Sequence, residues 1–292
     1  MKNKGIIYLV FAGVCYGIMG LLIRLLNNQI PPFAQVFLRY VVAFSLACLF
    51  AIQHKTNLKM NSVKDYIVMF SIGILGYGLT NALFTLSVIN TTLANAEFLF
   101  STFIIMTPLL GIFLLKERPG KFLWSAVILA TFGTYLLFKP SGTNGIQGEI
   151  FALIAAVFTS LYYIGSRNLK KYSAITLMVY STLSGVISVG LISLLTETSF
   201  FINTSNQSIT SVSPFTWLIV LFFGADNFLA WLFLNKGFQT VKAGVGSIIL
   251  LLEPIIGTLT GIIIYKEYPV LATILGIFAI LGAIILVIKE EK

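Results

Sequence analysis

The chain has 292 residues, of which 58% are hydrophobic and only 10% are charged. Soluble domains usually carry about 25% charged residues, so this composition excludes an ordinary soluble protein and indicates an all-α integral membrane protein. The net charge of +9 does not indicate nucleic-acid binding, because no basic stripe with interleaved aromatic residues lies on a soluble face. Cys15 and Cys48 fall inside apolar segments and are interpreted as small apolar residues, not as a disulfide.

Ten apolar segments are long enough to be transmembrane helices, since a bilayer core of roughly 30 Å requires about 20 residues. They lie near residues 5–26, 33–52, 66–86, 92–115, 121–138, 148–168, 174–195, 215–235, 243–265 and 270–288. The first segment lacks a small-residue cleavage site and is predicted to be a retained span. The polar stretch from Glu197 to Ser213 is predicted to be an exposed loop, and Pro140 to Gln147 a linker.

The order of motifs indicates one five-helix unit that occurs twice. Lys116-Glu117-Arg118-Pro119 ends the fourth span, and Lys266-Glu267-Tyr268-Pro269 ends the ninth. Similarly, Arg24 ends the first span and Arg167 ends the sixth. We therefore expect one repeat over residues 1–140, with spans one to five, and a second over 147–292, with spans six to ten. An odd number of spans inserts the two copies in opposite directions, and such inverted repeats are typical of secondary transporters.

Positive charge predicts the orientation, because Lys and Arg resist translocation across the membrane. With a cytoplasmic N-terminus, fifteen of the 19 basic residues lie on the cytoplasmic side. Three lie outside, namely Arg24, Lys139 and Lys266, and Arg39 lies within a span. Both termini are therefore predicted to be cytoplasmic in a multi-pass protein of the cell membrane, with the net charge also favouring contact with anionic lipid.

Small residues and prolines predict how the spans pack. Pairs four residues apart allow close helix approach, and they favour packing within one chain, so that a monomer or a weak homodimer is expected. These pairs are Gly13 and Gly17, Ala126 and Ala130, Gly257 and Gly261, and Ala279 and Ala283. Pro108 and Pro254 each fall inside a span and are predicted to be hinges, because proline interrupts the helical hydrogen bonds.

These features together resemble the EamA family of the drug/metabolite transporter superfamily. The two Lys-Glu-x-Pro segments carry the resemblance, with Leu251-Leu252-Glu253-Pro254-Ile255-Ile256-Gly257 and the small-residue stretch Lys242-Ala243-Gly244-Val245-Gly246-Ser247. In this family a proline typically precedes the terminal Glu by 13 residues, as Pro254 precedes Glu267, whereas Pro108 departs from that spacing before Glu117. The resemblance covers essentially the whole chain and implies a ten-helix transporter of small organic solutes, often an exporter of amino acids or related metabolites.

Four ionisable side chains lie inside predicted spans, where a charge needs a partner or a function. Asp226 lies near the middle of span eight, Glu253 near the middle of span nine, Glu97 in the outer half of span four, and Arg39 in span two. Arg39 could pair with Glu97 or Asp226 as a structural ion pair, and Glu253 could support the broken helix at Pro254. Alternatively, a central cavity with excess acid would bind a cation or zwitterion, with Arg39 facing a substrate carboxylate. Glu97, Asp226 or Glu253 could also couple transport to protons.

Aromatic residues in the spans favour a cation-binding cavity, because Tyr and Trp rings attract ammonium groups and suit a partly wet site. The candidates are Tyr16, Tyr77, Tyr162, Tyr163 and Trp231. The plainer alternative is that these rings face lipid or neighbouring helices. Tyr16 and Trp231 are the preferred substrate contacts, since Tyr16 lies in a glycine-flanked segment and Trp231 follows Asp226 by about 140° around the helix. Glu117 and Glu267 are interpreted as structural, as caps of the next helix or local ion pairs.

An enzyme is not expected. His54 lies in a loop, Asp226 is the sole Asp well inside a span, and no P-loop indicates ATP use. No His/Cys cluster indicates a metal, and no cofactor is expected. The sequence thus predicts alternating-access transport of a cationic or zwitterionic metabolite, such as an amino acid or amine derivative, with export favoured. The alternatives are an uptake carrier or exchanger for a bulkier sulfonium or nucleoside-bearing metabolite, and a passive channel. At the offset between Glu117 and Glu267 the buried acids are not repeated, so we expect substrate selection there.

Overall fold

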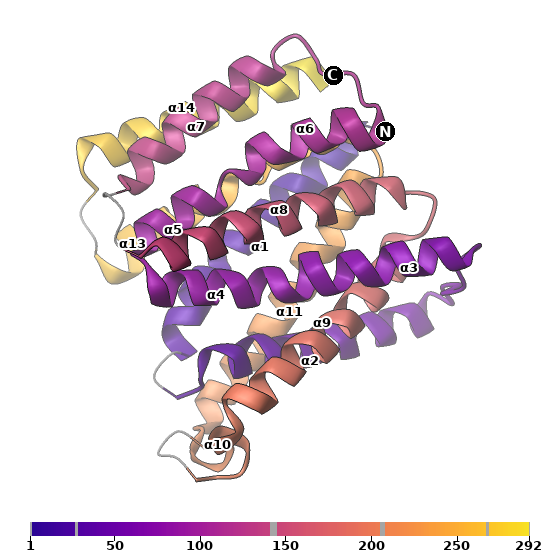
Figure 1. The fold of residues 1–292 in the computed structure, drawn as a ribbon, viewed down its shortest axis with the longest axis vertical. Coiled ribbons are helices and arrows are strands. Elements are labelled where there is room, and N and C mark those ends of the chain that lie inside the picture. Colours follow the sequence, from indigo (N-terminus) through magenta and orange to yellow (C-terminus); the bar gives the residue numbers. More distant parts are fainter. Residues whose placement is uncertain (1, 27–28, 141–144, 205–207, 267–268, 292) are drawn as a thin grey trace.

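The computed structural model describes residues 2–26, 29–140, 145–204, 208–266 and 269–291, and the regular elements in these ranges are all helices (Figure 1). The helices of the N-terminal half are α1 (Lys2–Leu26), α2 (Pro32–Gln53), α3 (Val63–Ile72), η1 (Gly73–Leu79), α4 (Thr80–Asn90), α5 (Leu93–Phe100), α6 (Phe103–Leu115) and α7 (Leu123–Phe138). The remaining helices are α8 (Ile146–Asn168), α9 (Ala174–Thr196), α10 (Thr198–Phe201), η2 (Ile209–Ser211), α11 (Pro214–Phe238), α12 (Ala243–Ile249), α13 (Leu252–Tyr265) and α14 (Leu271–Glu291).

The helical lengths confirm the predicted membrane-spanning organisation. In the described ranges, nine helical segments are long and apolar enough to cross a membrane, and α7, with 16 residues, is a shorter apolar helix. The third segment, Val63–Asn90, is longer than the predicted 66–86. It joins α3, η1 and α4 without a break, because η1 is a π-helical stretch that continues the helix with a wider turn.

The fourth and ninth spans are each interrupted near the middle. Span four is divided between α5 and α6 at Ser101 and Thr102, whose hydroxyls donate to the Glu97 and Leu99 carbonyl oxygens at 2.8 and 2.6 Å. The same two carbonyls also accept backbone N–H groups, from Ser101 (2.9 Å) and Thr102 (3.1 Å), so each hydroxyl adds a second bond at the interruption. The sequence places the hinge of this span at Pro108, but Pro108 lies inside the continuous helix α6.

Span nine shows the corresponding interruption. Residues 250–251 separate α12 from α13, and Pro254 lies in the first turn of α13, where its missing N–H needs no helical partner. Both interrupted spans end in the same way, since Lys116 and Lys266 adopt left-handed backbone conformations with φ of 53° and 54°. Glu267 and Tyr268, which follow, lie outside the described residues.

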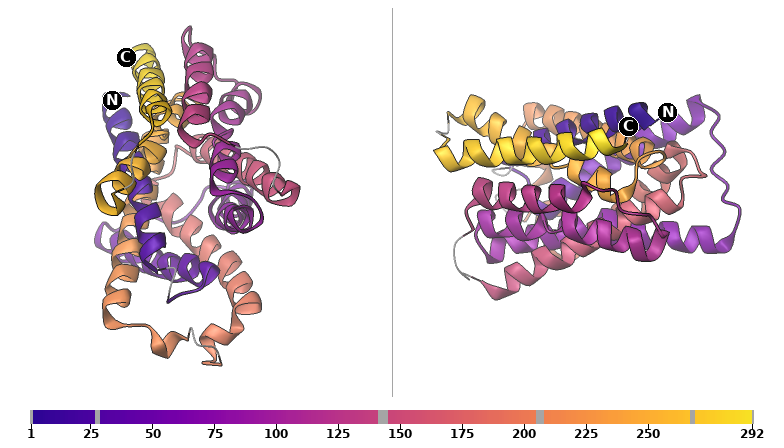
Figure 2. Two further views of the ribbon diagram at one scale, coloured as in Figure 1. Left: turned by 90° about the vertical axis from the view of Figure 1, so that its left-hand side faces the viewer. Right: turned by 90° about the horizontal axis from the view of Figure 1, so that it is seen from above.

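Corresponding helices of the two halves run antiparallel where they pack on each other. In the pair α7 and α14, Phe122 at the start of α7 donates its N–H to Glu290 at the end of α14 (3.1 Å). In the pair α2 and α9, Phe33 at the start of α2 bonds Glu197 just beyond the end of α9 (2.9 Å). The two chain ends lie at the same end of the bundle, which we call the terminal end (Figures 1 and 2).

Three helices are capped by carboxylates from elsewhere in the chain. The N-cap residues of α2, α7 and α12 make no side-chain capping bond. Instead, Glu197 caps α2, Glu290 caps α7 and Glu117 caps α12. An acidic group at a helix N-terminus satisfies free N–H groups and interacts favourably with the helix dipole. The predicted role of Glu117, as a cap of the next helix or a local ion pair, is therefore corrected: Glu290 caps that helix, and Glu117 acts on α12.

The sequence predicts a simple exposed loop from Glu197 to Ser213, but the start of this segment is partly helical and packed against the bundle. Phe200 in α10 is fully buried, and Glu197 accepts hydrogen bonds from Phe33 N–H (2.9 Å) and Ala34 N–H (2.6 Å). Ser193 donates to the same carboxylate at 3.1 Å. The start of this segment thus fastens the end of α9 to the beginning of α2.

Removal of this cap should destabilise the protein measurably. We expect Glu197→Ala to lower the free energy of unfolding by about 1–2 kcal/mol, and Glu197→Gln to lower it less, because the amide oxygen still accepts an N–H. Denaturant unfolding in detergent measures both. Burial raises the pKa of the Glu197 carboxyl, against the lowering effect of its hydrogen bonds.

The raised pKa gives this contribution a pH dependence of known sign. A carboxyl that protonates more readily in the folded state contributes stability below its ordinary pKa of 4.5 and loses that contribution as the pH rises through the folded value. Glu197→Gln should remove this part of the pH dependence of unfolding. An unchanged pH profile in the Gln variant would contradict the raised pKa, and equal stability of the Ala variant and the wild type would contradict the capping role.

Candidate functional site

Two oppositely charged side chains lie buried in the middle of the bundle, on neighbouring helices. Asp226 on α11 is 6% exposed and Arg39 on α2 is 3% exposed. They interact electrostatically, but they do not form a direct ion pair of the kind that other described side chains form. Each retains one buried atom with no hydrogen-bond partner in the described structure, Oδ2 of Asp226 and Nε of Arg39. Buried unpaired polar atoms are costly, so they point to a partner that arrives during function.

The Arg39 guanidinium is held by groups that leave its Nε free. Its Nη2 donates to the Asn81 side-chain oxygen at 2.6 Å, and the group lies over the Phe223 ring, 4.7 Å from the centroid. Asn81 in turn donates to the Tyr40 hydroxyl (2.6 Å) and to the Tyr77 carbonyl (3.1 Å). The structural alternative in which Arg39 pairs with Glu97 or Asp226 is thus replaced by a neutral amide partner.

The π-helix η1 provides the acceptor at the base of this network. The Tyr77 carbonyl accepts both from Asn81 and from the Tyr40 hydroxyl (2.7 Å). Glycines allow this wide turn to approach α8, since a Cβ on Gly76 would lie 2.5 Å from Tyr162 Cβ. The Tyr77 hydroxyl donates to Asn227 at 2.6 Å, beside Asp226 in sequence. The irregular turn therefore connects the surroundings of Arg39 to those of Asp226.

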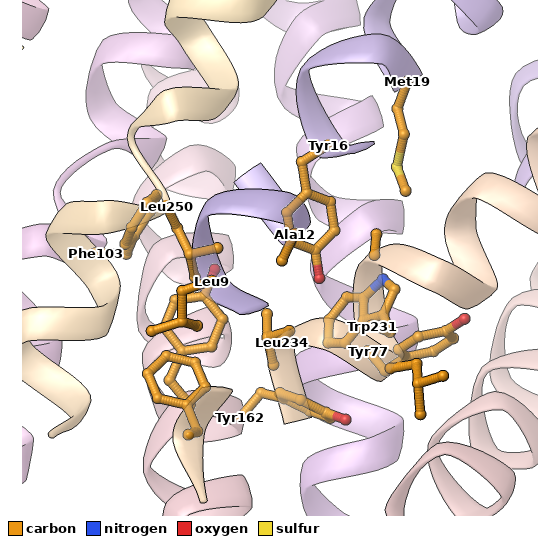
Figure 3. Packing of buried hydrophobic residues seen from close by; sticks show 14 of the residues in the cluster. Leu9, Ala12, Tyr16, Met19, Tyr77, Phe103, Tyr162, Trp231, Leu234 and Leu250 are labelled. Atoms are coloured by element: carbon orange, nitrogen blue, oxygen red, sulfur yellow. The ribbon is translucent and has the colours of Figure 1, made fainter. Parts of the chain in front are cut away.

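Four of the five aromatic candidates form one cluster around Trp231 (Figure 3). The Trp231 ring centroid lies 4.4 Å from that of Tyr77, 4.6 Å from Tyr162 and 5.8 Å from Tyr16. These tyrosines come from η1, α8 and α1, so the cluster joins helices of both halves. The Tyr16 hydroxyl is buried and has no hydrogen-bond partner in the described structure, which makes it a further candidate for a ligand contact.

Tyr163 borders this cluster, because it interacts electrostatically with Tyr16 and Tyr162. Its ring packs on Phe103 of α6 and Phe238 of α11, at centroid distances of 5.8 and 5.0 Å. It is close enough to Glu253 to interact electrostatically, as Tyr16 is. Tyr163 therefore borders both the acidic side of the site and the Trp231 cluster.

Glu97 and Glu253 lie on the two interrupted spans and interact electrostatically with each other. Glu97 is on α5, four residues before the break, and Glu253 is the second residue of α13. Both side chains are only partly buried, and neither carboxylate forms a hydrogen bond or ion pair with a described side chain or backbone group. The structure thus brings these two acids together and keeps Arg39 and Asp226 as a separate pair.

Sequence reasoning missed three amides that organise the site, Asn81, Asn227 and Asn235. Each is a strongly polar, uncharged residue inside an apolar span, and that is the signal by which they could have been found. Asn235 accepts from Ser166 (2.7 Å) and from the Tyr162 hydroxyl (3.3 Å). Among the described residues, no group of three or more His, Cys, Asp or Glu side chains is placed to hold a metal ion.

Both halves of the chain match one family, described as the EamA-like transporter family, over residues 3–139 and 146–289. Similar curated proteins include an uncharacterized transporter of Clostridium kluyveri, 24% identical over 99% of this chain and 95% of the relative. An uncharacterized transporter of Helicobacter pylori is 24% identical over 100% of this chain and 99% of the relative. One from Archaeoglobus fulgidus is 27% identical over 91% and 79%.

The fold also occurs among solved structures. A crystal structure with 16% sequence identity superposes with a TM-score of 0.81 and covers 98% of this chain and 96% of its own. At this identity the likeness concerns the fold alone. The repeated family match and the helical bundle together account for the two-fold pattern of motifs in the sequence.

Proposed function

Because this chain belongs to the EamA-like transporter family, we propose that it is a secondary carrier for a zwitterionic or cationic metabolite. The observation that carries the proposal is the pair of buried, oppositely charged groups, each with an unpartnered atom, at Asp226 and Arg39. An amino acid or amine derivative would place its ammonium group at Asp226 Oδ2. A substrate carboxylate would accept from Arg39 Nε.

The cost of burying charge supports a bound substrate with matching charges. A lone charge at membrane depth costs at least about 2.5 kcal/mol on the most lenient scale. A zwitterion would neutralise both side chains at once, whereas a simple amine would neutralise only Asp226. The Trp231 and Tyr16 rings lie on the adjoining side of the site, where they would contact the ammonium group or the apolar part of the substrate.

The second acidic pair is proposed to serve proton coupling. Glu97 and Glu253 lack basic partners among the described side chains. Both remain partly exposed, so a proton could reach them from solvent that enters the transport path. Their positions at the interrupted spans would tie protonation to the relative movement of the half-helices. Asp226 would then be kept for the substrate.

The repeats, the orientation in the membrane and the direction of transport complete the proposal. The two repeats are proposed to be residues 1–140 and 147–292, inserted in opposite directions, and the antiparallel packing of α2 with α9 and of α7 with α14 supports this division. The terminal end is proposed to face the cytoplasm of a cell-membrane protein, with export as the favoured direction and a monomer as the working state. The packed Trp231 cluster supports a carrier over an open channel.

Matched probe compounds can test the charge selectivity. Each set would contain an amino acid, the amine without its carboxylate, and the acid without its amine, for example leucine, 3-methylbutylamine and 4-methylpentanoate. We expect the thermal stability of the purified protein to rise most with the zwitterion of a responding set, less with the amine, and least with the acid. Binding of carboxylates or neutral compounds alone would contradict the proposal. Preferred binding of a bulkier sulfonium or nucleoside-bearing compound would support the alternative substrate class.

Arg39→Gln provides a second arm for this experiment. It should remove the advantage of the zwitterion over the amine, because only the carboxylate contact is lost. If the variant kept that advantage, Arg39 would not contact the carboxylate.

A further inference from the structure

Between Asp226 and the terminal end, successive contacts join α8 to α11. The first is aromatic, between Trp231 and Tyr162, with ring centroids 4.6 Å apart (Figure 3). The second is polar, because Asn235 accepts from Ser166 at 2.7 Å. Asn235 and Ser166 are both fully buried. Beyond these two contacts, α8 and α11 meet at a charged cluster.

Arg167, at the end of α8, is the centre of that cluster. Its Nε donates to Glu117 Oε1 at 2.9 Å. Its Nη1 donates to the carbonyl oxygens of Phe238 and Gln239, at 3.1 and 3.0 Å, where α11 ends. The Arg167 and Glu117 side chains are only 14% and 16% exposed. One guanidinium therefore joins the ends of α6, α8 and α11.

Glu117 extends the same cluster to α12. Its second oxygen accepts from Ala243 N–H at 3.0 Å and so caps a helix whose own N-cap residue makes no side-chain capping bond. Next to it, Gly244 packs against Pro108 of α6, where a Cβ would lie 3.1 Å from the proline Cβ. Glu117 thus holds α12 by charge at the point where α12 packs most closely on the first half.

We propose that Glu117 and Arg167 form a gate that closes the terminal end of the transport path. The cluster connects α6 of the first half to two elements of the second half that extend to the site. The first of these is α11, which carries Asp226 and Trp231, and the second is α12, which reaches the break before Glu253. Release of Glu117 would free the start of α12 and detach α6 from Arg167, which still holds the end of α11 through the Phe238 and Gln239 carbonyls, with residues 250–251 as the point of bending. This gate requires an alternating-access carrier, but it is independent of the substrate proposed above.

The native Cys15 can report the state of the gate. Cys15 lies within interaction distance of Asp226, and Cys48 is the other cysteine of the chain. In a Cys48→Ala background, a charged, membrane-impermeant thiol reagent would be applied to sealed vesicles from each side, with an N-terminal tag marking the terminal side. We expect Glu117→Ala to increase Cys15 labelling from the terminal side about tenfold, and Glu117→Gln less, because the amide can still cap α12.

The matched control is Asp65→Asn. Asp65 forms the other described ion pair, with Lys171 at 2.9 Å, and lies on α3, away from α12. Its loss should leave Cys15 labelling unchanged. Arg167→Lys should behave like Glu117→Ala, because Lys lacks the fork that reaches Glu117 and the two carbonyls simultaneously.

Hydrogen exchange separates a gate from a simple cap. If the Glu117 variants speed amide exchange at the start of α12 but leave terminal-side labelling of Cys15 unchanged, the cluster is structural and the gate proposal is overturned. Increased labelling from both sides, or in the Asp65 variant as well, would also overturn it, because that pattern reports general loosening. Since no substrate is present, neither result depends on the zwitterion proposal.

Discussion

Asp226→Asn is expected to reduce transport of the best-binding probe at least about 100-fold, because it removes a charge-assisted contact worth about 3 kcal/mol. Asn has nearly the same shape, so the fold should persist, and the loss of the buried charge should leave thermal stability unchanged or higher. Uptake into proteoliposomes measures the first quantity, and thermal unfolding in detergent measures the second.

Asp65→Asn is the control for this change, since it alters a carboxylate of the terminal end that bonds Lys171 and the Tyr172 hydroxyl. It should retain most of the transport. If Asp226→Asn transported the probe at the wild-type rate, Asp226 would not belong to the substrate site. Equal losses in both variants would indicate a general effect of removing carboxylates.

Gly17→Leu is expected to have the largest effect on stability among the changes considered. A Cβ at this position on α1 would lie 2.4 Å from Ile256 Cβ and 2.8 Å from the Glu253 carbonyl oxygen on α13. A backbone atom cannot turn away as a side chain can, so α1 and α13 must separate. We expect a loss of about 3 kcal/mol or more in unfolding free energy, above the usual range for overpacking, because backbone has to move.

Gly20→Leu on the same helix is the matched comparison, because a Cβ there has no neighbour within 4 Å. Leucine is the better helix former by up to about 1 kcal/mol, so this variant should be as stable as the wild type or slightly more so. Similar destabilisation by the two leucines would show that α1 and α13 do not depend on the close contact at Gly17.

Helix number, repeat pattern and membrane class follow from the sequence because they depend on properties that each segment has alone. Apolar length defines a span, and Gly13 and Gly17 mark a close contact without naming its partner. The structure supplies that partner, α13, since a Cβ at Gly13 would lie 2.9 Å from Leu252 Cβ.

Features that depend on three-dimensional contact could not be predicted in this way. Pro108 was the expected hinge of span four, but the helix is interrupted at Ser101 and Thr102, whose hydroxyls bond the Glu97 and Leu99 carbonyls. Glu117 was expected to act locally and instead bonds residues 50 and 126 positions away. Contacts between residues so far apart in the chain cannot be recognised from one sequence.

The candidate site shows the same division. Burial of Asp226 and Arg39 was evident from their position in apolar spans, whereas their partners were not. Asn81, which bonds Arg39, is itself held by the Tyr77 carbonyl of the π-helix η1 and by the Tyr40 hydroxyl, and contacts of this kind leave no reliable signal in one sequence. The sequence thus indicated the charges, and the structure showed which atoms of these charges remain unpartnered.

Counterflow is the most direct test of the central claim, that this protein carries a zwitterionic or cationic metabolite by alternating access through the Asp226–Arg39 site. Proteoliposomes loaded with unlabelled probe would be diluted into trace labelled probe. Alternating access through this site predicts transient, saturable accumulation of label above the outside concentration, which is abolished by Asp226→Asn and retained by Asp65→Asn. Flux that rises linearly with concentration and shows no such accumulation, or accumulation unaffected by Asp226→Asn, would contradict it.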